Sequence, residues 1–429
     1  MKKEIQYFSI RPKIILADTT ATVTVTDRCA QSFLKDGEEY EIHVYHMEHL
    51  PNYGNYDGDI QTVRAVGGTL KFQQFFPCEQ EHTVEIRRAG ADEEPFARLR
   101  VYSVENDLFA RNPYKGDLHM HSHCSDGAES PAFVAASCRK IGYDFMALTD
   151  HRVYKPSIAA QNAFETVRHD LLICRGEEVH PPENPVHIIN FGGSFSVNEL
   201  MSSDPEGYNK AVAEISKTVP VVDDEIREHI ASSIWAFNKI REGGGLSIFC
   251  HPYWLIPYGY YISETQISYL LEKQPFDAYE LIGGFERCDA ESNNLSVARY
   301  QEARAAGRKI PVVGVSDSHG CESGELFGWY YTIVFSASQQ QNDLIQGIKE
   351  LHSVAVEAVP GESVRVYGPF RLVKYALFLI REVFPEHDEL CAEEGALMRA
   401  YIGGSLEAAE RLNAMSGRTQ ELIQQMKSE

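Results

Sequence analysis

The chain carries several short clusters of histidine and acidic residues, and their types point to metal chemistry. Imidazole and carboxylate groups suit zinc, manganese and iron, and a His-x-His pair such as His119 and His121 can place both rings on one ion. A bridging carboxylate lets ions sit close together, which lowers the pKa of a bridging water and clamps the attacking and leaving oxygens of a displacement. The clusters therefore indicate a multinuclear site for hydrolysis. In chain order they lie at residues 117–121, 149–151, 176–178, 187–190, 250–252 and 316–319.

Each cluster lies at or beside a short apolar run. Taken alone, a His-x-His pair or a Ser-Asp-Ser-His segment is more often incidental than functional. Repeated placement of such clusters beside apolar runs, several with Gly or Pro adjacent, would require repeated coincidence in one domain. We therefore interpret them as parts of one site.

The apolar runs predict the elements that position this site. From residue 115 they alternate with helical stretches such as 131–140 and 223–242, a pattern typical of β/α units with parallel strands. In α/β barrels the C-terminal strand ends face one shared cavity, so clusters far apart in sequence can meet there. Residues 113–340 are therefore predicted to form a barrel or wound sheet. The runs cover residues 116–119, 145–149, 171–174, 186–191, 246–250, 278–282 and 310–315.

The residues before this domain have a different hydrophobic pattern. Residues 1–112 contain alternating runs such as 21–26 and 40–45, which predict an antiparallel β-sandwich or barrel. The same alternation would scatter neighbouring histidine side chains, so three of them are predicted to be ordinary strand or loop residues. These are His43, His46 and His49.

Residues 341–429 are predicted to form a C-terminal extension. It follows a last strand candidate at 329–335, and its pattern is helical from residue 365 onward. The extension is equally compatible with a cap on the preceding domain and with a partner surface.

Composition narrows the classes of function. A hydrophobic content of 43% is typical of a folded protein. The formal net charge of −22 would repel a polyphosphate backbone, so long nucleic acid is not an expected partner. Nine cysteines without a CxxC pair argue against a disulfide framework and a thiolate zinc site. The N-terminus lacks the apolar stretch of a signal peptide, and no run approaches membrane-spanning length, so a cytoplasmic location is expected.

The clusters resemble those of the polymerase and histidinol phosphatase (PHP) superfamily of metal-dependent phosphoesterases. The resemblance covers residues 115 to 335, and the motifs follow the family's order. They are Asp117-Leu-His-Met-His-Ser-His-Cys-Ser-Asp-Gly127, Leu148-Thr-Asp-His151, Gly176-Glu-Glu178, His187-Ile-Ile-Asn190, Cys250-His-Pro252 and Ser316-Asp-Ser-His319. An N-terminal sandwich ahead of a Gly-Asp-Leu-His opening is similar to the branch related to carbamate-ester hydrolases.

The resemblance implies a distorted seven-stranded (β/α) barrel with three divalent ions, whether zinc, manganese or iron. One ion would take His119, His121, Glu178 and Asp317; a second would share Glu178 and add His187 and His251; the third would take Asp126, His151 and His319. A strand turns Glu177 and Glu178 to opposite faces, so only one can bridge ions, and the G-x-E spacing favours Glu178.

Further residues near the clusters are candidates for contact with a substrate. Arg287 and Arg152 can each offer a bidentate fork to a phosphate, with Arg287 slightly favoured, although a surface ion pair would explain either. His180 and His123 are extra histidines near the clusters. A role in supporting the ligands or facing the substrate and an ordinary loop position are equally compatible with each.

The leading functional expectation is a phosphoesterase that acts on a small phosphorylated molecule through a metal-bridging hydroxide. One alternative is hydrolysis of a carboxyl or carbamate ester at the same metals. A second, from another class, is a non-catalytic metal-binding module, although structural ions are usually fully enclosed by protein ligands. The sequence leaves the substrate, the metal and the oligomeric state open.

Overall fold

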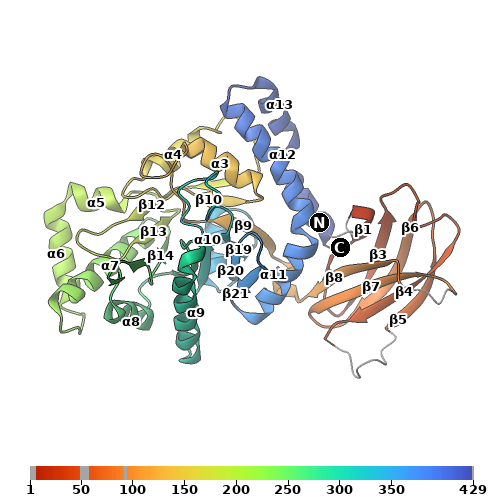
Figure 1. Ribbon diagram of the computed structural model, residues 1–429, viewed down its shortest axis with the longest axis horizontal. Coiled ribbons are helices and arrows are strands. Elements are labelled where there is room, and N and C mark those ends of the chain that lie inside the picture. Colours follow the sequence, from red (N-terminus) through yellow and green to blue (C-terminus); the bar gives the residue numbers. More distant parts are fainter. Residues whose placement is uncertain (1–5, 49–57, 91–93, 428–429) are drawn as a thin grey trace. The chain divides into compact units, whose positions relative to one another are not determined.

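The computed structural model describes residues 6–48, 58–90 and 94–427, which form two compact units (Figure 1). The first comprises Met1–Asn112, Lys374–Leu390 and Gly417–Glu429, and the second comprises Pro113–Val373 and Cys391–Ser416. The unit therefore changes after residue 112, and residues 341–429 are divided between the two units. His49 lies outside the described residues.

The described residues of the first unit form two sheets. One has the strand order β1(Phe8–Arg11), β3(Thr19–Asp27), β6(Thr69–Phe76), and the other β2(Ile14–Leu16), β8(Ala97–Val104), β7(Gln80–Arg88), β4(Glu39–His46), β5(Asp59–Arg64). Alternate residues of β3 and β4, such as Val23, Val25 and Ile42, are buried in one hydrophobic core, as a period of two requires of strands with one solvated face. The described residues of this region thus form strands, as the alternation predicts, while the sandwich or barrel arrangement stays a prediction.

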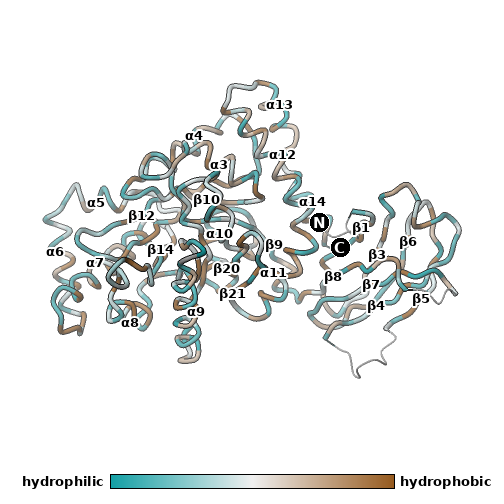
Figure 2. The backbone as a smooth tube through the Cα atoms, in the orientation of Figure 1, coloured by the Kyte–Doolittle hydropathy of each residue, from teal (hydrophilic) through white to brown (hydrophobic). Residues whose placement is uncertain are grey.

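The second unit also contains two main sheets. The first has the order β11(Leu172–Cys174), β10(Phe145–Ala147), β9(Asn112–Asp117), β19(Tyr330–Ser336), β20(Ser353–Glu357), β21(Arg365–Tyr367). The second has the order β12(Gly176–Val179), β13(Ile188–Phe191), β14(Leu246–Phe249), β17(Ala278–Gly283), β18(Val312–Val315). Figure 2 shows hydrophobic colour on central strands such as β14, where all four residues are buried.

Strand directions in the second unit are mixed. Strands β9, β10 and β11 are parallel, as are β14, β17 and β18, which confirms the predicted parallel β/α units. In contrast, β13 is antiparallel to both β12 and β14, and β20 is antiparallel to β19. The strands expected in one barrel thus fall into two sheets, so closure into a seven-stranded barrel stays a prediction.

Helices connect and cover these strands. The helix α7(Asp224–Glu242) matches the predicted helix: the Asp223 side chain accepts a hydrogen bond from Ile226 N at its start, and the glycines from Gly243 onward end it. The others are α2(Asn106–Phe109), α3(Pro131–Lys140), α4(Lys155–Asn162), α5(Val197–Ser203), α6(Pro205–Ser216), α8(Glu264–Lys273), α9(Ala290–Ala305), α10(Gln341–Lys349), α11(Phe370–Glu382), α12(Phe384–Ile402), α13(Leu406–Met415) and α14(Arg418–Met426). Within the described ranges, no helix has both the length and the apolar character needed to cross a membrane.

Candidate metal centre

The histidines and carboxylates predicted as ligands converge at the ends of the second unit's strands. His119 and His121 follow β9, and Asp317 follows β18. Asp317 Oδ1 lies 3.1 Å from His119 Nε2 and 2.9 Å from His121 Nε2. Both histidines are buried, so this group forms the inner part of the assembled set of predicted ligands, which is called the cluster from here on.

Glu178 occupies the middle of the cluster. Its fully buried carboxylate lies 2.6 Å from His151 Nδ1, 2.8 Å from His187 Nδ1 and 3.2 Å from His251 Nε2. The neighbouring Glu177 faces away, because its carboxylate accepts hydrogen bonds from Ser196 and Asn198. The strand alternation therefore places Glu178, rather than Glu177, among the imidazoles, as the spacing favours.

A third group lies at the more exposed side. Asp126 is 3.3 Å from His151 Nε2 and 3.3 Å from His319 Nε2, and the side chains of Asp126 and His319 are 56% and 39% exposed. The ring of His121 stacks on that of His319 at 4.3 Å between centroids. One side of the cluster thus opens to solvent, while the side around Glu178 is closed.

The donor atoms fit divalent metal ions. Groups whose ligand atoms all lie within 4.8 Å of one another include His121 with Asp126, His151 and His319; His119 with His121 and Asp317; and His119 with Glu178 and His251. Several buried donor atoms also lack a hydrogen-bond partner among the described residues, and an uncompensated buried polar atom is costly. They are His119 Nε2, His121 Nδ1, Glu178 Oε2, His187 Nδ1 and His251 Nδ1.

The short approaches around Glu178 do not remove this need. His151 Nδ1 and His187 Nδ1 lie close to the carboxylate oxygens, yet Glu178 Oε2 and His187 Nδ1 have no partner in hydrogen-bond geometry. A cation between these imidazole nitrogens and carboxylate oxygens would coordinate them and supply the missing partners.

The pKa shifts differ among the groups of the cluster. Burial alone would raise the pKa of Glu178, but the close imidazoles of His119 and His151 outweigh it and hold that pKa well below its usual value. Burial lowers the pKa of His187 to about 4, against the opposing effect of Glu178, so this ring is neutral near pH 7. Anionic carboxylates and neutral imidazoles are the forms that bind metal, and Glu178 and His187 are in these forms. Against the opposing effect of burial, the carboxylates of Glu178 and Asp317 raise the pKa values of three other rings, so a bound cation would displace protons from these rings. They are His119, His151 and His251.

Carboxylates around the cluster orient its members. Glu280, in β17, lies 3.3 Å from His119 Nδ1 and accepts a hydrogen bond from His251 N at 3.0 Å. Asp117 accepts hydrogen bonds from His119 N and Ser316 N, and burial raises its pKa to about 7. The sequence reasoning missed Glu280, although an acidic residue inside an otherwise apolar run was the available signal.

The backbone is strained at three positions of this site. His251, Asp317 and Arg152 have φ values of 27°, 51° and 60°, in the left-handed region that non-glycine residues rarely adopt. Such conformations persist where the surrounding structure fixes them, and they gather at functional sites. The strain therefore supports a functional role for the strand ends that carry these residues.

Two cavities adjoin the cluster and share His187. One, of about 170 Å³, is lined by predicted ligands including Asp317 and by Trp254; the other, of about 630 Å³, includes Arg152 and His180 in its wall. His180 Nε2 also lies 3.0 Å from His151 Nδ1. His180 and Arg152 thus stand beside the cluster, where a bound molecule can reach them.

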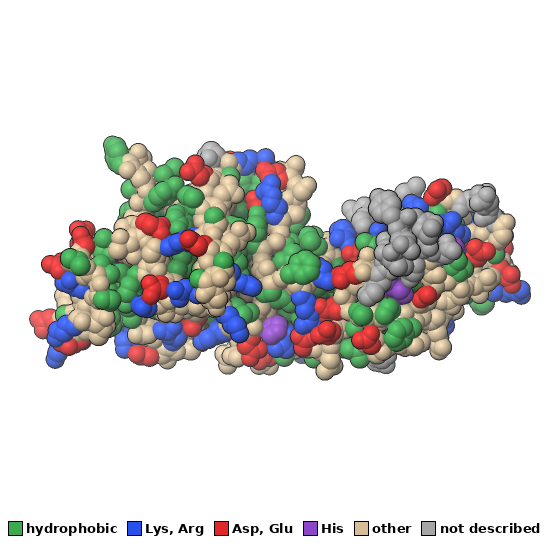
Figure 3. All heavy atoms as spheres, turned by 90° about the horizontal axis from the view of Figure 1, so that it is seen from below, with side chains coloured by type: hydrophobic (Ala, Val, Ile, Leu, Met, Phe, Trp, Pro, Cys, Tyr) green, Lys and Arg blue, Asp and Glu red, His purple; other side chains and the backbone are tan. Residues whose placement is uncertain are grey.

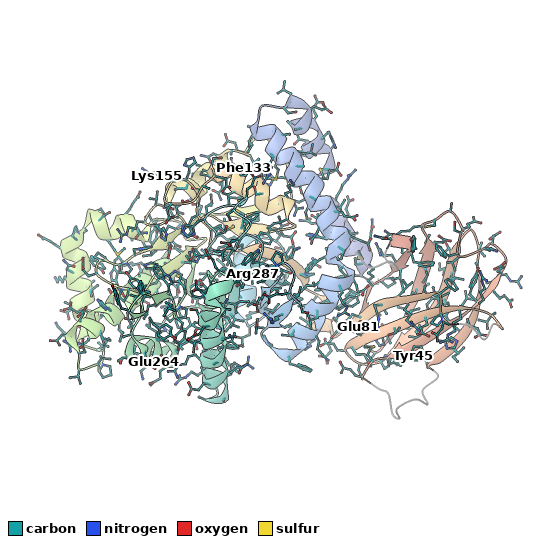
Figure 4. The ribbon with its side chains drawn as sticks, viewed as in Figure 1. Tyr45, Glu81, Phe133, Lys155, Glu264 and Arg287 are labelled. Carbon is teal, nitrogen blue, oxygen red and sulfur yellow. The ribbon has the colours of Figure 1, made fainter. Side chains whose placement is uncertain are left out.

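The other candidate residues lie elsewhere. Arg287, in the short 3-10 helix Arg287–Asp289 just before α9 (Figure 4), donates a hydrogen bond to Pro360 O and lies 5.3 Å from the ring centre of Trp329; it lines neither cavity. His123 is exposed in the loop before α3. In the first unit, His43 and His46 belong to β4, where His46 Nδ1 lies 2.8 Å from His82 Nδ1.

The cluster and its cavities form a candidate metal centre, and the comparisons with known proteins are partial. No family model matches the chain. The chain is 46% identical over 116 residues to the DNA polymerase/3′-5′ exonuclease PolX of Bacillus subtilis (strain 168); the match covers 25% of this chain and 18% of PolX. The chain thus corresponds to only a small part of that relative.

The solved structures that match part of the chain include two proteins with low TM-scores. A two-domain protein from Bacteroides vulgatus, containing a predicted PHP-like metal-dependent phosphoesterase, has a TM-score of 0.40 at 17% identity, covering 57% of this chain and 65% of that one. An amidohydrolase from Chromobacterium violaceum with bound sulfate has a TM-score of 0.30 at 16% identity, covering 48% and 87%. These similarities are too weak to argue activity from. The motif order and the converging ligands agree with the resemblance to the PHP superfamily, and membership of that superfamily stays a prediction.

Proposed function

We propose that the protein is a metal-dependent phosphoesterase that acts on a small phosphorylated molecule. The observation that carries the proposal is the convergence of buried, unsatisfied imidazoles and carboxylates on a cavity with one open side. Bound divalent ions would activate a water for attack and neutralise the phosphate oxygens. The resemblance supports three ions, with the ligand sets given above.

The chain's own residues contribute binding and orientation. Glu178 and Asp317 remain anionic and hold the inner imidazoles in place, while the exposed Asp126 and His319 leave room for a ligand to enter. Among the arginines, Arg152 is the better candidate for neutralising phosphate charge, because it lines the larger cavity. The preference for Arg287 over Arg152 is therefore reversed in this proposal.

A small substrate also suits the surface charge. In Figure 3, Asp and Glu side chains lie among the Lys and Arg side chains of the second unit. With a net charge of −22, a long polyanion would meet repulsion over much of the protein. A small phosphate ester can instead be neutralised locally by ions in the cluster.

The test is hydrolysis by metal-analysed protein. Phosphate release from nucleotides, sugar phosphates and simple diesters would be measured beside release from carboxyl and carbamate esters. We expect phosphate release that Asp317→Ala and His319→Ala abolish. Ester cleavage without phosphate release would replace the proposal by the carbamate-hydrolase alternative, and inactivity on every compound would favour a non-catalytic metal-binding module.

A further inference from the structure

A small hairpin next to the metal centre exposes an unusual number of aromatic rings. The hairpin consists of β15(Leu255–Ile256) and β16(Gly259–Tyr260). Large apolar side chains that gather on a surface commonly mark a binding site. The exposed aromatic residues are Trp254 at 41%, Tyr258 at 99%, Tyr260 at 42% and Tyr261 at 39%.

The hairpin backbone pairs two of these rings and fixes them to the cluster. Tyr261 N donates to Trp254 O at 2.9 Å, so the two residues face each other where the strands begin and end. Their ring centroids are 5.1 Å apart at an interplanar angle of 65°. Trp254 N in turn donates a hydrogen bond to His251 O at 3.1 Å, so the backbone that carries the Trp254 ring is bonded directly to that of a predicted ligand.

The Trp254–Tyr261 pair lies where the two cavities adjoin. The Trp254 ring is 5.8 Å from that of His251 and 6.1 Å from that of His187, and the Tyr261 ring is 5.9 Å from that of His187. Trp254 lines the smaller cavity, and Tyr261 lines the larger one. A molecule whose phosphate reaches the cluster would therefore place its next atoms against these rings.

The ring geometry leaves room for stacking. The contacts of Trp254 and Tyr261 with the neighbouring rings are tilted or edge-on, and among the described rings none stacks face to face on either. The two residues nevertheless remain 41% and 39% exposed. A planar group can cover such faces without displacing another side chain, and a tyrosine and a tryptophan supply large area at low conformational cost.

We propose that Trp254 and Tyr261 hold a planar ring in the leaving group of the substrate. The inference rests on the proposed phosphoesterase function and narrows its substrate to a phosphomonoester whose leaving group carries an aromatic or heteroaromatic ring, as in a nucleotide. Stacking of the ring positions the ester bond at the cluster. The selectivity is for the ring's flat face, so several bases or aryl groups are accepted.

The test compares substrates with and without a planar ring. For AMP, Trp254→Ala and Tyr261→Ala are each expected to lower kcat/KM by about 10- to 100-fold, while for ribose 5-phosphate the loss stays below about threefold. Tyr258→Ala is the matched control, because this residue lies on the same hairpin, is 99% exposed and lines neither cavity. It is expected to leave both rates unchanged.

Two outcomes would overturn the inference. Equal losses on AMP and ribose 5-phosphate would show that the hairpin only positions His251, and unchanged rates on AMP would show that the rings do not contact the substrate. If wild-type protein releases phosphate from neither ester, the proposed function fails separately. The stacking is then tested by AMP quenching of tryptophan fluorescence, which Trp254→Phe must reduce; quenching that persists in this variant also overturns the inference.

Discussion

Two carboxylates in different units, Glu386 with 11% of its side chain exposed and Glu178 fully buried, have opposite surroundings. In the first unit, Glu386 accepts hydrogen bonds from Arg11 at 2.8 Å, Lys13 at 2.8 Å and Arg28 at 2.9 Å. In the second unit, Glu178 is surrounded by imidazoles, and its Oε2 has no partner in hydrogen-bond geometry. A charge that is paired with other side chains of the protein contributes to the fold. A buried charge without such a partner marks a position where a ligand can bind.

Removal of the ions from the second unit should have the largest effect. Chelation, or Glu178→Gln, is expected to lower hydrolysis by about 10³-fold or more, because the positive charge that activates water is lost. Chelation should also lower the unfolding temperature of the wild type, since ions that bind only the folded state stabilise it. Metal analysis, rate measurement and thermal unfolding on the same samples check both parts. Full activity in metal-free protein would contradict the assignment of Glu178 to a metal site.

An intermediate effect is expected where a satisfied carboxylate supports the cluster. Glu280 contacts His119 Nδ1 and His251 N, so Glu280→Gln should weaken metal binding or activity by about 10- to 100-fold. Added metal should restore part of the rate, which a general folding defect would not allow. A titration of activity against zinc or manganese distinguishes the two, with Glu177→Gln as a neighbour whose carboxylate faces away from the cluster.

The carboxylate in the first unit should affect stability and not hydrolysis. Burial would raise the pKa of Glu386, but Lys13 and Arg11 hold it at about 2, below its unfolded value of 4.5. Burial of Lys13 lowers the pKa of that ammonium and offsets part of the gain. Glu386→Gln is therefore expected to lower the free energy of unfolding by about 2 kcal/mol at pH 7.

The pH dependence follows from the sign of the shift. The folded pKa lies below the unfolded one, so the stabilisation by Glu386 is present above about pH 4.5 and is lost as the pH falls towards 2. Urea unfolding of wild type and Glu386→Gln at several pH values should show a difference that shrinks in this window. The exposed pair of Glu39 and Arg64 in the same unit supplies the control: Glu39→Gln should change stability by less than about 0.5 kcal/mol.

The sequence predicts the cluster well because ligand chemistry leaves a strong local pattern. Pairs such as His119 and His121 are recognisable by residue type and spacing, and the strand ends bring them together. The direction of β13 was not predictable, because a buried strand has the same hydrophobic pattern in a parallel or an antiparallel pair. Glu280 was missed because its partners, His119 and His251, lie on other strands.

Arg287 gives the smallest expected effect and the sharpest test of the comparison. Sequence position alone made it a candidate for contact with phosphate, but its guanidinium already contacts Pro360 O and the ring of Trp329, which are distant in sequence. If satisfied groups are structural, Arg287→Ala should change kcat/KM by less than about threefold, while Arg152→Ala lowers it by about tenfold or more because one charge-assisted contact to phosphate is lost. Steady-state rates on one phosphate ester decide between them. A larger loss for Arg287→Ala would mean that the guanidinium leaves Trp329 when substrate binds, and that a satisfied charge can still serve the reaction.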